Sequence, residues 1–214
     1  MVGKAAGLLR EGGAVASVGH TDATYEEVVR ALDAGFTKVT HLYNAMSPLT
    51  HRAPGAVGAT LDDDRVRAGI IADGVHVHEG ALRVAYRQKG ADGLALVTDA
   101  MEAAGMPPGV YELSGRNIRL QDKAVRLPDG TLAGSALTVD RAVRNAVALL
   151  GVSPQTAARM ASETPAEILG MPEKGRIVRG ADADLVVLAP DLSVEETIVD
   201  GETVYKKGDD GRRA

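Results

Sequence analysis

Short β-branched runs alternate with helical patterns over the first hundred residues of the chain. Each run is typical of a strand, because β-branched residues favour extended backbone, and each finishes in polar residues. The four runs are 14–21 (AVASVGHT), 37–44 (TKVTHLYN), 66–78 (VRAGIIADGVHVH) and 93–100 (GLALVTDA). A repeated order of strand and helix predicts a parallel sheet with right-handed crossovers.

Two of the segments between these strands carry signals for helix ends. Thr24 and Glu27 have the spacing of a capping box, and Gly35 suits the end of the same helix. A second helical pattern, 79–90, ends at Gly90. The pattern therefore predicts helices of ordinary length between the strands.

The pattern changes after Asp99. Alternating apolar residues within 111–130 predict hairpin strands. Three helices are then expected, and they are 139–151, 153–162 with Ser153 as its cap, and one that starts at Thr164. Short strands follow Asp184, with a hairpin turn at Asp200 and Gly201. Only four strand and helix units precede the change, whereas a (β/α)8 barrel needs eight and roughly 250 residues.

Composition narrows the classes of function. The chain has 45% apolar and 25% charged residues, as an ordinary soluble protein does. A net charge of -5, one Phe and no Trp argue against nucleic acid as a partner. No apolar run approaches the ~20 residues that span a bilayer, so we expect a cytoplasmic protein with no membrane partner. Because the chain has no cysteine, any metal must be bound by His, Asp or Glu.

All five histidines lie before residue 79. His20 and His41 each end a predicted strand, and one helix separates these strands, so their imidazoles are expected to converge at one rim of the sheet. That arrangement suits a metal with nitrogen and oxygen ligands. The alternative is that each histidine is bonded to backbone at a strand end. His76 is interpreted as a substrate contact, and His78 as structural.

Asp99 follows an apolar run, so its carboxylate is expected at the mouth of the sheet. There it would act as a general base toward a metal-activated water, or would only cap the next turn. Asn44, Ala45 and Arg52 lie in a loop that resembles an anion-binding loop, in which the arginine would clamp a phosphate. A solvated arginine is the alternative. The segment 127–140 lacks the phosphate-loop pattern, and we expect an ordinary loop there.

Six stretches together resemble one family in order along the chain. They are VGHTDATYEE, THLYNAMSPLTHRAPG, IADGVHVH, LVTDAMEAAG, DGTLAGSALTVDRAVRN and ASETPAEILGMPEKGRIVRGADADLVVL. They are similar to the C-terminal portion of the N-acetylglucosamine-6-phosphate deacetylase family, in the amidohydrolase superfamily. The resemblance implies an α/β fold, the second half of an incomplete (β/α)8 TIM-type barrel with part of a small C-terminal β-sandwich domain. The expected division is 1–175 for the barrel half with an inserted hairpin region and 176–214 for the sandwich strands and tail.

The resemblance also implies roles for individual residues. His20 and His41 would bind the metal, and Asp99 would be the catalytic acid and base. The implied contacts to the sugar phosphate come from one set of residues: Asn44, Ala45, Arg52, His76, Leu132, Ala133 and Gly134. The arginine reaches across a dimer interface in some relatives, so a homodimer is expected.

The reaction implied by the resemblance is hydrolysis of the acetamide of N-acetylglucosamine 6-phosphate to glucosamine 6-phosphate and acetate. The metal is expected to be zinc, with iron, manganese or cobalt also admitted by these ligands. The family's metal site also uses a glutamate from an earlier strand, which has no counterpart here, so the chain alone is expected to be inactive or very weakly active. Two alternatives remain open: another amidohydrolase activity, such as a deaminase or cyclic-amide hydrolase, and a non-catalytic module that binds sugar phosphate.

Overall fold

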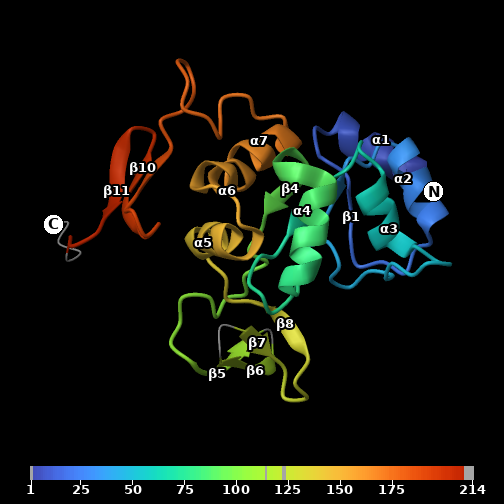
Figure 1. The fold of residues 1–214 in the computed structure, drawn as a ribbon, viewed down its shortest axis with the longest axis horizontal. Helices are drawn as coiled ribbons and strands as arrows, with labels where there is room; N and C mark the ends of the chain where they lie inside the picture. Colours follow the sequence, from blue (N-terminus) through green and yellow to red (C-terminus); the bar gives the residue numbers. More distant parts are fainter. Residues whose placement is uncertain (1, 114, 122–123, 210–214) are drawn as a thin grey trace.

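A four-stranded parallel sheet lies at the centre of the computed structural model, which describes residues 2–113, 115–121 and 124–209 (Figure 1). The strand order is β1-β2-β3-β4, and Lys38 lies opposite both Ser17 and Arg67. The strands are β1 (Ser17–Val18), β2 (Lys38–Val39), β3 (Arg67–Ile70) and β4 (Leu94–Leu96). All four predicted strands are confirmed, and the chain has the expected α/β fold with the four-stranded half of a barrel sheet.

Helices follow the first three strands: α2 (Tyr25–Asp33), α3 (Gly55–Asp62) and α4 (Glu79–Gly93). The capping box is confirmed, because Thr24 accepts from the Glu27 amide and the Glu27 carboxylate accepts from the Thr24 amide. Gly35 follows α2 with φ +103°, as expected of a glycine at a helix end. The helical backbone of α4 breaks at Gly90, where φ is +65°, and a last turn then continues to Gly93.

Two helices were not predicted from the sequence. One is α1 (Val2–Glu11), and the other is α3, which lies in a stretch read as a loop. Every residue from Gly55 to Leu61 is buried. A helix that is buried on all sides has no polar stripe, so the hydrophobic period that identifies a surface helix is missing.

A second sheet is inserted after β4. Its antiparallel strands are β5 (Gly109–Leu113), β6 (Arg116–Gln121), β7 (Ala124–Arg126) and β8 (Leu132–Ser135). It has a small apolar core of its own, which includes Ile118, Leu120 and Val125. The predicted hairpin is confirmed, but the expectation of an ordinary loop throughout 127–140 is wrong, because residues 132–135 pair with β7 as strand β8.

Three helices then return to the central sheet: α5 (Val139–Leu150), α6 (Pro154–Ala161) and α7 (Glu163–Leu169). Ser153 caps α6 as predicted and accepts from the Thr156 amide. The predicted start of α7 at Thr164 is wrong, because the helix begins at Glu163 and the Thr164 hydroxyl donates instead to the Ala91 carbonyl at 2.8 Å.

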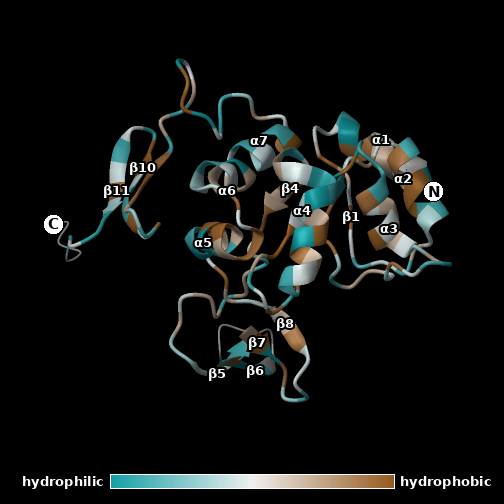
Figure 2. Cartoon of the chain, viewed as in Figure 1, coloured by the Kyte–Doolittle hydropathy of each residue, from teal (hydrophilic) through white to brown (hydrophobic). Residues whose placement is uncertain are grey.

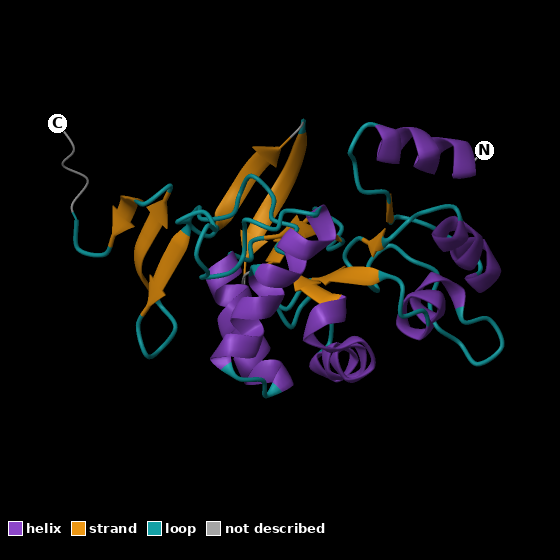
Figure 3. Ribbon diagram, turned by 90° about the horizontal axis from the view of Figure 1, so that it is seen from above, coloured by secondary structure: helices purple, strands orange, loops and turns teal. Residues whose placement is uncertain are grey.

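The main core lies between the parallel sheet and these helices. Figure 2 shows strand β4 in brown, next to helices that carry both brown and teal segments. Ile70, Leu82, Leu94 and Met160 are fully buried in it. Figure 3 shows that the helices, apart from the one at the N-terminus, lie on one side of the parallel strands. None of the helices in the described ranges has the length and apolar character that a membrane-spanning helix needs.

A third sheet ends the described chain and projects from the body (Figure 1). Its antiparallel strands are β9 (Leu185–Leu188), β10 (Val194–Val199) and β11 (Glu202–Lys206), in the order β11-β10-β9. Asp200 and Gly201, with φ +51° and +81°, form the predicted hairpin turn. Apolar side chains of this sheet, among them Val186 and Val204, are about half exposed. The last five residues of the predicted tail lie outside the described residues.

Candidate active site

Polar side chains gather where the four parallel strands end. His20 lies two residues after β1, and His41 lies two residues after β2. Asp73 lies three residues after β3, and Asp99 lies three residues after β4. Parallel strands end at the same edge of their sheet, so all four groups lie at this edge, which is formed by the C-terminal ends of the strands. Enzymes built on parallel barrels have their active sites at this end of the sheet.

The two histidines at this edge face each other through the same ring nitrogen. The Nε2 atoms of His20 and His41 lie 2.9 Å apart, and the ring planes cross at 73°. His41 is only 4% exposed, whereas His20 is exposed. The structure therefore brings together the two residues that the sequence pairs as metal ligands.

The pair fits a metal ion in the type and direction of its donors. Two imidazole nitrogens on a tetrahedral zinc, each at about 2.0–2.1 Å, would lie roughly 3.3 Å apart, close to the observed separation. Catalytic zinc sites use three protein ligands. Within the described residues, no group of three or more His, Asp or Glu side chains is placed to hold a metal. The histidine pair thus has the donors for two of the three positions of such a site.

Backbone conformation sets these residues apart from the rest of the chain. Only seven non-glycine residues in the described ranges have positive φ, and five of them lie at this edge: His20, His41, Tyr43, Ala45 and Asp99. Positive φ is costly for residues with a Cβ, and such conformations cluster at functional sites. The surrounding contacts must therefore hold these turns in place.

Ser47 joins the loops that follow the two histidines. Its amide donates to the Thr21 carbonyl at 3.0 Å, and its hydroxyl donates to the Ala23 carbonyl and accepts from the Ala56 amide at 2.8 Å. The amide of Thr21 also donates to the Ala45 carbonyl at 2.9 Å. Sequence reasoning missed this serine, because a serine in a loop has no distinctive pattern.

The loop after β2 is tightly turned. The side-chain amide of Asn44 donates to the carbonyls of His41 and Leu42 at 3.4 and 3.3 Å, and Ala45 is exposed. The Tyr43 hydroxyl donates to the Ala81 carbonyl at 3.1 Å, and burial raises the pKa of this phenol. Asn44 and Ala45 therefore lie at the edge of the His41 turn.

Arg52 lies further along the same loop and is exposed. With Thr24, Tyr25 and Pro54 it lines a hollow of about 340 Å³. It makes no hydrogen bond or ion pair with any described residue, so the structure does not bring it to the histidine pair. Its guanidinium is free to meet an external anion.

Strand β8 runs beside Asp99. The Ser135 amide donates to the Asp99 carbonyl, and the Met101 amide donates to the Ser135 carbonyl, both at 2.9 Å. A Cβ on Gly134, where φ is +94°, would lie 2.3 Å from the Cγ of Met101. The predicted segment from Leu132 to Gly134 is thus held next to Asp99, whose exposed carboxylate has no hydrogen-bond partner among the described residues.

His76 is paired with Asp73, which sequence reasoning did not select. The Nδ1 atom of His76 lies 2.6 Å from a carboxylate oxygen of Asp73. Burial alone would raise the pKa of Asp73, but hydrogen bonds from the His76 ring and from the amides of Val75 and His76 outweigh it and lower that pKa. An aspartate that follows a strand and precedes a glycine, as in ADGVH, is the signal that could have found it. His78 caps α4 by accepting from the Gly80 amide, in agreement with its structural interpretation.

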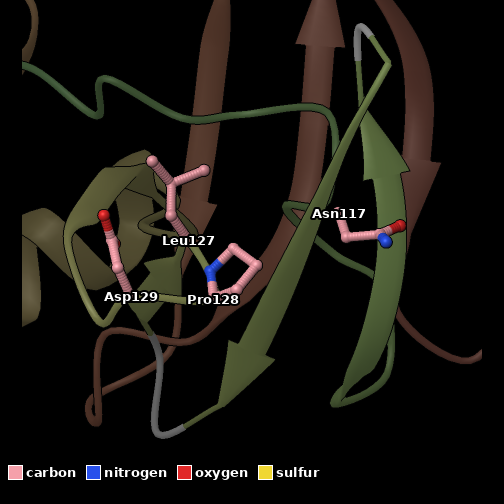
Figure 4. Close-up of a pocket in the computed structure, with 4 residues that line it drawn as sticks. All are labelled: Asn117, Leu127, Pro128 and Asp129. Atoms are coloured by element: carbon pink, nitrogen blue, oxygen red, sulfur yellow. The ribbon is translucent and has the colours of Figure 1, made fainter.

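A separate hollow of about 460 Å³ lies on the inserted sheet and is lined by Asn117, Leu127, Pro128 and Asp129 (Figure 4). Asp129 is its single ionisable lining residue, and a hydrogen bond from the Thr131 amide lowers the pKa of that carboxyl. The hollow has no base or metal ligand besides this exposed carboxylate. The edge with the histidines is therefore the better candidate for chemistry.

Comparisons with known proteins show which family the chain resembles. A sequence model described as the amidohydrolase family matches residues 12–204. N-acetylglucosamine-6-phosphate deacetylase of Lysinibacillus sphaericus is 44% identical over 193 residues, which are 90% of this chain and 50% of that protein. N-acetylgalactosamine-6-phosphate deacetylase of Escherichia coli is 43% identical over 186 residues, which are 86% of this chain and 49% of that protein.

A solved structure gives a similar result. A variant of N-acetyl-D-glucosamine-6-phosphate deacetylase from Mycobacterium smegmatis, in complex with N-acetyl-D-glucosamine-6-phosphate, matches with a TM-score of 0.88 and 41% identity. The match covers 94% of this chain and 54% of that one. The chain spans about half the length of the curated relatives it matches.

Proposed function

The chain belongs to the amidohydrolase family, and on that premise we propose that it carries part of the active site of an N-acetylglucosamine-6-phosphate deacetylase. The observation that carries the proposal is the convergence of the His20 and His41 Nε2 atoms at the strand edge that also bears Asp99. Relatives named for the glucosamine and for the galactosamine substrate are 44% and 43% identical to this chain, so the proposed substrate class is an N-acetylhexosamine 6-phosphate.

In this proposal the histidines hold a divalent metal, zinc by preference, or iron, manganese or cobalt. When bound, such a metal acidifies water and polarises a carbonyl group. Asp99 removes a proton from the attacking water while the oxygen of that water bonds to the acetyl carbon. The same carboxyl then gives the proton to the departing amine as the carbon–nitrogen bond breaks, so the products are acetate and glucosamine 6-phosphate.

The remaining site residues bind the sugar phosphate. Arg52, exposed and without a partner among the described residues, would form paired hydrogen bonds to the phosphate. Asn44, Ala45 and His76 would complete the contacts, and the segment from Leu132 to Gly134 would lie over the sugar. Binding energy from the phosphate then lowers the barrier at a carbon remote from it.

We also propose that residues 1–175 and 176–214 form separate units and that the chain forms a homodimer. Four parallel strands leave β1 and β4 at the edges of the sheet, whereas a closed barrel has no edge strand.

With two metal ligands instead of the usual three, the 214-residue chain alone is expected to hydrolyse little or no substrate. Turnover of N-acetylglucosamine 6-phosphate by the purified chain with added zinc, at a rate ordinary for the family, would contradict this.

One observation also favours a second candidate, a module that binds sugar phosphate without hydrolysing it, because two ligands make an incomplete catalytic site. Calorimetry with glucosamine 6-phosphate, combined with metal analysis, separates the two. The deacetylase proposal expects stoichiometric metal and sugar-phosphate binding. Binding of the sugar phosphate by a metal-free chain, unchanged when zinc is added, would favour the module.

A further inference from the structure

Asp73 and His76 form a deeply buried hydrogen-bonded pair at the candidate site. Their side chains are 3% and 5% exposed. The pair follows β3, between the strands that lead to His41 and to Asp99. Helix α5 is hydrogen-bonded to the residue before Asp73, since the side-chain amide of Asn145 donates to the Ala72 carbonyl at 2.8 Å.

The hydrogen bonds of Asp73 determine which nitrogen of His76 is engaged. One carboxylate oxygen accepts from the amides of Val75 and His76, each at 2.8 Å. The other oxygen lies 2.6 Å from the Nδ1 atom of His76. An ionised carboxylate only accepts, so the Nδ1 atom carries the proton of this contact. The ring is thereby fixed with its second nitrogen, Nε2, turned away from Asp73.

That second nitrogen is buried and has no hydrogen-bond partner in the described part of the chain. Buried polar atoms nearly always have a partner, and those without one call for an explanation. The mechanism proposed above assigns His76 to the sugar phosphate but gives Asp73 no role. A ligand group that meets Nε2 would satisfy the unpaired atom.

We propose that Asp73 is a positioning residue, which holds the Nδ1 atom of His76 so that Nε2 is the atom presented to the bound sugar phosphate. The inference rests on the proposed function for the identity of the ligand. Asp73 itself touches no substrate. Its effect on binding is transmitted through the orientation and tautomer of the imidazole.

The variant Asp73→Asn separates this role from simple packing, because asparagine has nearly the same shape. Its oxygen would remain with the two amide donors, and its NH2 group would then face Nδ1. A ring that accepts at Nδ1 must carry its proton on Nε2. The variant is therefore expected to move the proton to the nitrogen that faces the ligand.

The test is nitrogen NMR of the 214-residue chain labelled at histidine, with and without glucosamine 6-phosphate, for the wild type, Asp73→Asn and Asp140→Asn. Asp140→Asn is the matched control, because Asp140 is also partly buried and paired, with Arg144 at 2.6 Å, but lies in the first turn of α5. We expect Nδ1 of His76 to be protonated in the wild type and the control, and Asp73→Asn to shift the proton to Nε2. We also expect that variant to bind glucosamine 6-phosphate at least tenfold more weakly.

An unchanged His76 spectrum in Asp73→Asn would overturn the inference. So would a wild type that binds glucosamine 6-phosphate together with an Asp73→Asn variant whose loss of binding is no larger than that of the control. A proton shift in a chain whose wild type shows no response to glucosamine 6-phosphate would support the positioning by Asp73. The missing response of the wild type to glucosamine 6-phosphate would count against the proposed function, but not against the positioning of His76 by Asp73. The two failures are thus distinguishable in one set of spectra.

Discussion

Ser135 donates its amide to the backbone carbonyl of Asp99 at 2.9 Å, so strand β8 pairs with the chain just beyond the end of β4. The serine hydroxyl adds two contacts, as a donor to the Thr98 carbonyl and an acceptor from the Leu137 amide. Ser135 is completely buried. The inserted sheet therefore holds the turn that carries the proposed catalytic carboxylate.

Replacing Ser135 with alanine should destabilise this edge of the sheet. Removing the hydroxyl leaves the Thr98 carbonyl and the Leu137 amide without this hydrogen-bond partner. An unsatisfied buried polar group costs about 1–3 kcal/mol. We expect the free energy of unfolding in urea to fall, and the Leu137 amide to exchange faster with solvent. Ser153→Ala, which removes a helix cap on α6, is the control: it should cost about 1 kcal/mol and leave Leu137 exchange unchanged.

Gly134 should tolerate a side chain less well than another glycine with similar backbone. Gly130 has φ +89° and open space around it, whereas at Gly134, with φ +94°, a Cβ would meet Met101. Gly134→Ala and Gly130→Ala thus share the backbone strain, and only the first adds a clash. Unfolding measurements should give the larger loss for Gly134→Ala. Equal losses would mean that β8 is not packed against the Asp99 turn as described.

Asp73 should make stability depend on pH in acid. Its pKa is lower in the folded chain than the value near 3.9 of an unfolded one, because its hydrogen bonds outweigh burial. Such a carboxyl stabilises the fold above pH ~4, and the contribution is lost as the pH falls through the folded-state pKa. Between pH 5 and 2, approximately, the unfolding free energy of Asp73→Asn should fall less steeply than that of the wild type.

The control for that titration is Asp92→Asn, at an exposed ion pair with Arg159. Exposed pairs contribute little to stability, so its curve should follow the wild type. If the unfolding free energy of Asp73→Asn falls with pH as steeply as that of the wild type and of Asp92→Asn, the lowered pKa of Asp73 in the folded chain is contradicted.

Arg52→Ala should weaken the binding of glucosamine 6-phosphate. A charge-assisted hydrogen bond contributes about 1.5–3 kcal/mol, so calorimetry should show a loss of roughly 10- to 100-fold. Binding of glucosamine, which lacks the phosphate, should not change. The exposed Arg87 on α4 provides the control, as Arg87→Ala should bind like the wild type. Equal effects on both ligands would exclude a phosphate contact.

Sequence patterns predicted the elements whose signals are local. The capping box of Thr24 and Glu27 and the turn at Asp200 and Gly201 depend on neighbouring residues, and both were found. Strand β8 was missed because its pairing with β7 is decided by contacts distant in sequence. Helix α3 was missed because complete burial removes the amphipathic period.

The candidate site was likewise predicted only where its residues have a local sequence signal. His20 and His41 were paired from their positions at successive strand ends, which a parallel sheet brings to one edge. Asp73, Ser47 and Ser135 were not selected, because their importance lies in what they hold in place. Hydrogen bonds between separate loops, such as those of Ser47 to Ala23 and Ala56, have no signature in a single sequence.

Titration of zinc into the chain, followed by calorimetry, tests the central claim most directly. We expect one zinc to bind per chain, and His20→Ala and His41→Ala each to reduce the affinity by roughly tenfold or more, since removing even a supporting residue costs 10- to 100-fold. His51→Ala, which removes an exposed histidine of the same loop region, should leave zinc binding unchanged. If the wild type takes up no zinc, or if His20→Ala and His41→Ala bind it as the wild type does, the two histidines are not the metal ligands proposed.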